Sequence, residues 1–204
     1  MVSTVEDALT VAENGPDVIV AQGSEAGGHR STWEKKPTKE YAAIGTLPLT
    51  AAIVHAVKIP VVAAGGIVNG KGLMAALMLG AQGVLMGTRF LATSESLAPE
   101  FHKQKILNTG SDKTTVTDIF TGMYARVIRN KFTRTYTESK VPVLPPGSQY
   151  GLTMDIQEAS GKQENAELYP LYAGQGIDLI KKIKPAGEVV GEVIAEAKDF
   201  LENK

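Results

Sequence analysis

The sequence contains no cysteine, and this absence excludes several kinds of chemistry. Disulfide scaffolds, thiolate metal sites and cysteine nucleophiles all need a residue that the chain lacks. An excess of charge of one sign is also missing, because 21 lysines and arginines oppose 22 aspartates and glutamates, for a formal net charge of -1. Neither nucleic acid nor an anionic membrane surface is therefore indicated as a partner. A small-molecule ligand is the better expectation.

Long apolar runs are absent as well. No stretch approaches the roughly 20 apolar residues of a membrane span. Residues 1–10 lack the basic start and the apolar centre of a signal peptide. We therefore expect a soluble, cytoplasmic protein with no membrane contact. With 204 residues, 43% of them hydrophobic, the chain can bury a sizeable core in one domain or in a domain with an appendage.

Short apolar runs alternate with amphipathic segments along the first half of the chain. The runs at residues 17–21, 61–64 and 83–86 are typical of strands that are buried on both faces. Segments with apolar residues at helical spacing accompany them, at residues 4–12, 46–57 and 70–79. Thr4 begins a capping pattern, and Thr46 is expected to cap the second helix. Strands that alternate with helices predict an α/β fold with a parallel sheet.

Glycine-rich turns follow the predicted strands. The polar segment 21–29 contains Gly27 and Gly28, the second strand ends in Gly65-Gly66, and the third ends in Gly87-Thr88. In a parallel sheet the carboxyl ends of the strands meet at one edge, and β/α barrels commonly bind a phosphate in the loops after their last two strands. A single glycine pair is also common in turns that bind nothing, but two pairs separated by one helix and strand make that interpretation weaker.

The chain divides by composition into two predicted parts. Residues 1–108 are predicted as part of a β/α barrel, and residues 109–204 as a helical extension that packs on it. A complete barrel typically takes about 250 residues, and this chain has only three strand and helix pairs. Either the fold is an open α/β layer, or the chain is the C-terminal portion of a longer barrel. The start at residues 1–4 favours the second possibility. Residues 30–45 are expected to form a long polar loop of the kind that often acts as a lid.

His29 stands at the tip of the first glycine-rich segment. An imidazole titrates near neutrality and can act as a general base, although a solvated loop histidine is the alternative. His55 and His102 are expected to be structural or exposed, His102 facing solvent beside Lys103. The three histidines lack the spacing of metal ligands, so we expect no metal.

Three stretches, taken in this order and spacing, resemble the nitronate monooxygenase family, formerly called 2-nitropropane dioxygenases. They are residues 17–29, 59–67 and 83–90, and the resemblance continues through residues 121–130 and 173–176. It implies an FMN-dependent TIM (β/α)8 barrel with a helical extension on the substrate side. The chain looks like the C-terminal part of such a protein.

The resemblance also implies roles for individual residues. His29 would be the catalytic residue, and the residues that bind FMN would be Gln22, Gly27, Gly65, Gly66, Met86, Gly87 and Thr88. These roles make physical sense, because backbone N–H groups at glycine turns bind anions and the Thr88 hydroxyl adds a donor. The amide of Gln22, a donor and an acceptor, suits the mixed edge of an isoalloxazine ring.

The implied activity is that of a flavin-dependent oxidoreductase. Members of the family oxidise alkyl nitronates, such as propionate 3-nitronate or those derived from nitroalkanes, with O2 to a carbonyl compound and nitrite. His29 would remove the α-proton of a neutral nitroalkane, or as imidazolium would hold the anionic nitronate. Two alternatives stay open: an FMN barrel reductase that uses NAD(P)H on an enoyl thioester or quinone, and an inactive truncated fragment. Whether the extension helices form a homodimer is also open.

Overall fold

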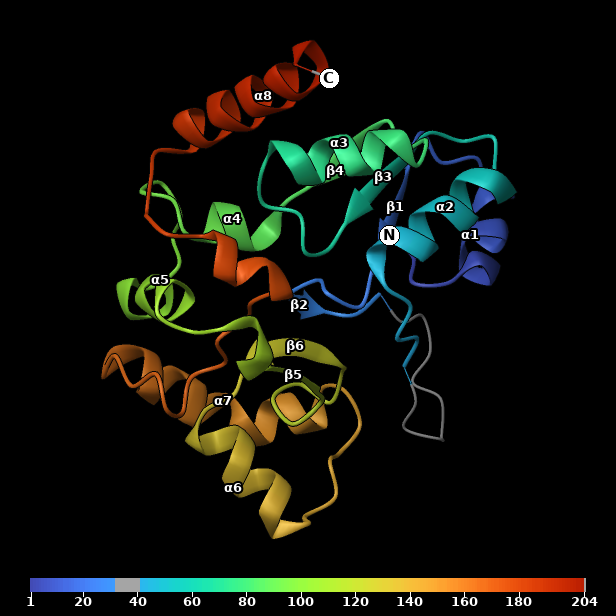
Figure 1. Cartoon of the computed structure of the whole chain (residues 1–204). Coiled ribbons are helices and arrows are strands. Elements are labelled where there is room, and N and C mark those ends of the chain that lie inside the picture. Colours follow the sequence, from blue (N-terminus) through green and yellow to red (C-terminus); the bar gives the residue numbers. More distant parts are fainter. Residues whose placement is uncertain (32–40, 204) are drawn as a thin grey trace.

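The structure, a computed structural model, describes residues 1–31 and 41–203. Two three-stranded sheets form its centre, and helices cover both of them (Figure 1). Most of the predicted polar loop, residues 32–40, lies outside the described residues. No helix in the described part of the chain is long and apolar enough to cross a membrane.

The first sheet is parallel, as the alternation of strands and helices predicts. Its strands are β1 (Ile19–Gln22), β3 (Val61–Ala64) and β4 (Gly83–Leu85), in the order β1-β3-β4. Val2 adds a parallel bridge to Ala21 at the outer edge of β1. The predicted α/β class is therefore confirmed, but the described strands form an open sheet and not a closed barrel.

Three helices accompany this sheet: α1 (Val5–Ala12), α2 (Thr46–Ala56) and α3 (Gly70–Met78). The predicted cap of α1 is confirmed, since the Thr4 side chain accepts a hydrogen bond from the backbone N–H of Asp7. Apolar side chains of α1 and α2 pack with the strands in one core, whose buried members are Val2, Ala8, Ile19, Ala21, Leu49, Ile53 and Val61. This packing fixes the strand ends that carry the glycine turns.

The second sheet is antiparallel and joins the two predicted parts. Its strands are β2 (Gly28–His29), β5 (Thr114–Thr117) and β6 (Ala125–Ile128), in the order β2-β6-β5. The sequence predicts a purely helical extension, but the extension contributes two strands: β6 pairs with β2, and β5 pairs with β6. Gly28 lies opposite Arg126, and His29 lies opposite Ala125.

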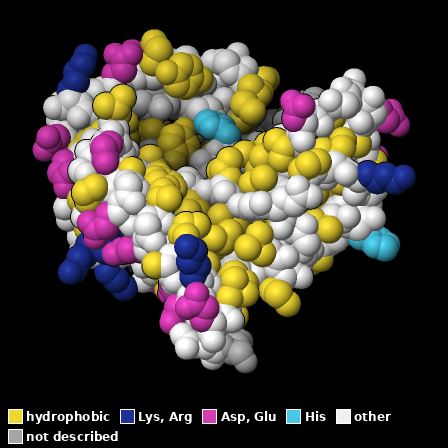
Figure 2. Space-filling view, turned by 90° about the horizontal axis from the view of Figure 1, so that it is seen from above, with side chains coloured by type: hydrophobic (Ala, Val, Ile, Leu, Met, Phe, Trp, Pro, Cys, Tyr) yellow, Lys and Arg dark blue, Asp and Glu magenta, His cyan; other side chains and the backbone are white. Residues whose placement is uncertain are grey.

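The other helices surround the second sheet and the end of the first. They are α4 (Gly87–Leu91), α5 (Glu100–Leu107), α6 (Lys131–Ser139), α7 (Ser148–Lys162) and α8 (Ala186–Glu202), with short 3-10 turns η1 (Ser111–Lys113) and η2 (Gln175–Leu179). In Figure 1, α3 lies between the parallel sheet and α8, whereas α6 and α7 lie beyond the antiparallel sheet. The face seen in Figure 2 is hollowed, and apolar side chains gather around the hollow.

Candidate functional site

A cleft opens at the carboxyl ends of the three parallel strands. It has about 520 Å³ of empty space, part of which is open solvent. Six of the residues predicted to bind FMN line it: Gln22, Gly27, Gly65, Gly66, Gly87 and Thr88. Met86 and His29 are not among the lining residues. Gly174 and Gly176 are, and the only sequence signal for them is the glycine pattern at residues 173–176.

Most glycines of the cleft are required either by close backbone packing or by their backbone conformation. A Cβ on Gly27 would lie 2.4 Å from the backbone nitrogen of Gly174, and a Cβ on Gly176 would lie 2.8 Å from the carbonyl oxygen of Gly66. Gly65 and Gly66 also have positive φ angles, of +120° and +69°, which residues with a Cβ rarely adopt. These glycines bring three turns together whether or not a ligand is present.

Gly87 differs from the other glycines that line the cleft, because no atom lies within 4 Å of the position that its Cβ would take. Neither its conformation nor its packing therefore requires a glycine. The space in front of it belongs to the cleft. Glycine at this position lets a ligand approach the backbone at the start of α4.

Backbone N–H groups without a protein acceptor surround this space. Within the described residues, those of Gly66, Gly87 and Thr88 donate to no protein atom. The Thr88 hydroxyl oxygen accepts from the backbone N–H of Gly174 at 2.9 Å, which leaves its own hydrogen free to donate. N–H groups at strand-end turns and at the first turn of a helix form a common site for phosphate. The donor set thus fits the phosphate of FMN.

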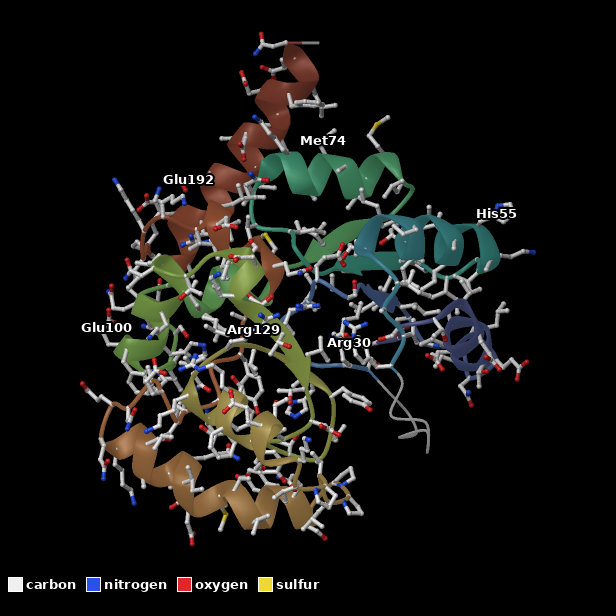
Figure 3. The ribbon with its side chains drawn as sticks, turned by 60° about the horizontal axis from the view of Figure 1, so that its bottom comes forward. Arg30, His55, Met74, Glu100, Arg129 and Glu192 are labelled. Carbon is white, nitrogen blue, oxygen red and sulfur yellow. The ribbon has the colours of Figure 1, made fainter. Side chains whose placement is uncertain are left out.

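Two buried arginines hold the carbonyl groups of the first glycine-rich turn. Arg30, only 2% exposed, donates from its guanidinium to the carbonyl oxygens of Gln22 and Gly23. Arg126 on β6 donates from Nε to the carbonyl oxygen of Ser24 at 2.9 Å. Burial lowers the pKa of both arginines, and repulsion by Arg126 lowers the pKa of Arg30 further. Figure 3 shows Arg30 in the interior; the sequence did not identify it.

Gln22 connects the cleft to the strand that carries His29. Its Nε2 donates to the carbonyl oxygen of His29 at 2.9 Å, and its Oε1 accepts from the backbone N–H of Ser31 at 2.7 Å. Its side chain thus fixes β2, and one amide hydrogen remains for a ligand.

Glu25 caps α2, a role that the sequence assigned to Thr46. The N-cap of α2 is Gly45, and Thr46 is already the first helical residue. The Glu25 carboxylate accepts from the backbone N–H of Thr46 at 2.8 Å and from its hydroxyl at 2.9 Å. The expectation for Thr46 was wrong because a carboxylate from a turn 21 residues away satisfies the end of the helix.

His29 lies beside two residues of the extension. Its Nε2 is 2.9 Å from the hydroxyl oxygen of Thr121, and its ring centroid is 5.5 Å from that of Tyr172. Burial lowers the pKa of His29, so the neutral imidazole predominates near pH 7. Burial raises the pKa of Tyr172 to about 12, so its phenol stays protonated.

The two other histidines have different surroundings. His102 is 4% exposed, and its Nε2 lies 2.9 Å from the carbonyl oxygen of Tyr172. The expectation that His102 faces solvent was wrong, because His102 lies on the face of α5 that packs against the core. His55 points away from the molecule at the outer end of α2 (Figure 3).

The parallel strands and the anion-binding turns at their carboxyl ends are those of a β/α ligand-binding protein. The sequence profile of the nitronate monooxygenase family matches residues 1–196, and the chain belongs to this family. A probable nitronate monooxygenase of Bacillus subtilis is 43% identical over 86% of the chain and 50% of its own length. Another, from Staphylococcus haemolyticus, is 42% identical over 98% of the chain and 56% of its own length. The chain thus spans about half the length of these relatives.

Two solved structures are similar to the chain. Nitroalkane oxidase from Streptomyces ansochromogenes has a TM-score of 0.89 at 39% identity, over 97% of this chain and 56% of the oxidase. FabK from Thermotoga maritima has a TM-score of 0.82 at 32% identity, over 99% of this chain and 61% of FabK.

Proposed function

We propose that the chain carries the FMN site and the catalytic histidine of a nitronate monooxygenase. The reaction is the oxidation of an alkyl nitronate, such as propionate 3-nitronate or one derived from a nitroalkane, with O2 to a carbonyl compound and nitrite. The three parallel strands would belong to a TIM barrel that binds the flavin at their carboxyl ends. Family membership and the likeness to nitroalkane oxidase support this proposal.

The observation that carries the proposal is the set of N–H groups on Gly66, Gly87 and Thr88 that lack protein acceptors around one cleft. These groups and the Thr88 hydroxyl would hold the FMN phosphate, and Gln22 would offer its remaining amide hydrogen to the ring. Bound FMN would supply the redox chemistry. The protein contributes position, charge and proton transfer.

His29 would handle the proton of the substrate. Because Thr121 occupies Nε2, only Nδ1 remains available to a substrate. The lowered pKa keeps the ring neutral, as a base needs to be, and Nδ1 would remove the α-proton of a neutral nitroalkane. The imidazolium formed in this way would hold the resulting nitronate anion. With a preformed nitronate no proton has to be removed, and the Tyr172 phenol, which stays protonated, would donate to the anion.

The experiment combines flavin reconstitution with turnover. The purified chain is incubated with FMN, freed of unbound flavin, and assayed for nitrite release and oxygen uptake on propionate 3-nitronate. We expect a yellow protein that produces nitrite. A protein that retains flavin but produces no nitrite would contradict the activity while leaving the cofactor site intact.

The likeness to FabK supports a second candidate, an FMN barrel reductase that uses NAD(P)H on an enoyl thioester or quinone. Rapid bleaching of the bound flavin by NADPH, without oxygen uptake on a nitronate, would favour this candidate.

A further inference from the structure

A second cavity, separate from the cleft, lies between α4, α8 and the segment that connects η2 to α8. It has about 740 Å³ of empty space, part of which is open solvent, and it shares only Val68 with the cleft. Its charged lining residues are Arg89, Lys181, Lys182, Lys184, Glu192 and Glu196. We refer to it as the Arg89 cavity. Figure 3 shows Glu192 on α8, on one side of this region.

Arg89 is a buried cation whose hydrogen-bond partners are all neutral. It is 7% exposed, and one terminal nitrogen donates to the carbonyl oxygens of Ala92 and Lys182, each at 3.0 Å. Its Nε has no partner, and within the described residues no carboxylate lies within 4 Å of the guanidinium. Glu192 attracts this guanidinium electrostatically but does not bond to it. A buried charge without a bonded counterion is unfavourable, so an anion that enters the cavity would be stabilised by Arg89.

The two carboxylates of the cavity already have partners. Glu192 pairs with Lys184, which also bonds Glu188 at 3.0 Å. Glu196 accepts a hydrogen bond from the backbone N–H of Gly70 at the start of α3.

The remaining positive charge is that of Arg89, Lys181 and Lys182. Glu192 attracts the Arg89 guanidinium electrostatically, and Asp178 attracts Lys181. The Asp178 carboxylate is itself bonded to the backbone N–H and hydroxyl of Ser111. The side chains that line the Arg89 cavity carry four positive charges against two negative ones, so its own carboxylates do not neutralise its positive charge.

We propose that the Arg89 cavity binds a phosphate group, held by Arg89 at its buried end and by Lys181 and Lys182 at its rim. A guanidinium offers a planar pair of donors that matches two phosphate oxygens. A phosphate dianion also matches the excess positive charge of the side chains that line the cavity. The phosphate group belongs either to free inorganic phosphate or to a phosphate monoester. This site does not depend on the proposed flavin chemistry.

The test is isothermal titration of the full chain with inorganic phosphate and, in a second arm, with glycerol 2-phosphate, at constant ionic strength set with chloride. We expect one saturable site, and the tighter of the two titrants identifies the source of the phosphate group. Replacing both lysines, in Lys181→Gln/Lys182→Gln, should weaken binding about tenfold. Lys198→Gln on α8 is the matched control and should leave binding unchanged. Arg89→Met should abolish binding, but it also removes the bonds to Ala92 and Lys182, so the exposed lysine pair provides the decisive variant.

Saturating FMN distinguishes this cavity from the cleft. Phosphate binding that persists with FMN present supports the Arg89 cavity, whereas phosphate that FMN displaces occupies the cleft and overturns the proposal. Absence of phosphate binding, or equal affinity in the lysine double variant, also overturns it. None of these results depends on whether the chain turns over a nitronate.

Discussion

The Nε2 atom of His29 lies 2.9 Å from the hydroxyl oxygen of Thr121, although 92 positions separate the two residues in the chain. The Thr121 oxygen also lies 3.3 Å from the carbonyl oxygen of Met123. If the hydroxyl donates to that carbonyl, it accepts the proton of Nε2, and Nδ1 keeps its lone pair. If His29 is the base, as we propose, Thr121 would be a positioning residue that leaves Nδ1 to accept the proton.

Thr121→Val should keep the shape of this contact and remove its hydrogen bond. We expect kcat on a neutral nitroalkane to fall about threefold to tenfold, the equivalent of one neutral hydrogen bond. Thr121→Ser should restore most of the activity. The pH profile of kcat checks this role. If Thr121 acts through His29, the pH at which kcat falls on the acidic side should shift in Thr121→Val, whereas a merely structural role would leave that pH unchanged.

His29→Asn separates the two tasks assigned to the imidazole. Turnover of a neutral nitroalkane should fall by a factor on the order of 10² to 10⁴, because the general base is lost. Turnover of a preformed nitronate should fall much less, since no proton is removed. His55→Asn, at an exposed position, serves as the control. Equal rates for His29→Asn and the unmodified chain on both substrates would show that His29 is not catalytic.

Gly27→Ala and Gly87→Ala form a matched pair within one cleft. The first adds a methyl group 2.4 Å from a backbone nitrogen, and overpacking of this kind costs about 1 to 3 kcal/mol of stability or more. The second adds a methyl group into open space, so it should leave the melting temperature unchanged and weaken FMN binding. Thermal melts and FMN titrations of both variants check this difference. A Gly87→Ala protein with unchanged FMN affinity would mean that the ligand does not approach α4.

His102 should make the fold sensitive to acid. Burial lowers its pKa in the folded chain below the ordinary 6.5 of the unfolded chain. Between the pKa of the folded chain and that of the unfolded chain, the unfolded chain binds more protons. The contribution of His102 to the free energy of unfolding is therefore fully present above about pH 6.5 and is lost as the pH drops through the folded pKa. Urea unfolding on both sides of this range measures the loss. His102→Gln should reduce the pH dependence, whereas His55→Gln should not.

The parallel sheet was accessible to sequence reasoning because its strands are buried on both faces. Runs such as residues 61–64 are uniformly apolar, and the helices between them have clear caps or glycine ends. The second sheet was not accessible. β2 has two residues and β5 is the polar run Thr114–Thr117, so neither has a period that sequence patterns can detect.

Six of the seven residues that the resemblance assigns to FMN line one cleft, but the contacts that bring them together were not predictable from the sequence. The role expected for Gly27 comes from the resemblance to the family, yet the structural reason for its lack of a side chain is the approach of Gly174, which no local pattern contains. Arg30 and Thr121 were missed because their roles depend on partners brought together by the fold. His29 was expected in the same site as the glycines, but its pairing in β2 directs it to Thr121 and Tyr172.

The most direct test of the cofactor site compares FMN with riboflavin, which has the same ring but no phosphate. Fluorescence titration of the chain should give saturable FMN binding, with riboflavin at least about tenfold weaker, because phosphate bonds to the N–H groups of Gly66, Gly87 and Thr88 would be missing. Equal affinity for the two flavins, or no binding of either, would contradict the assignment of this cleft as the phosphate site of FMN.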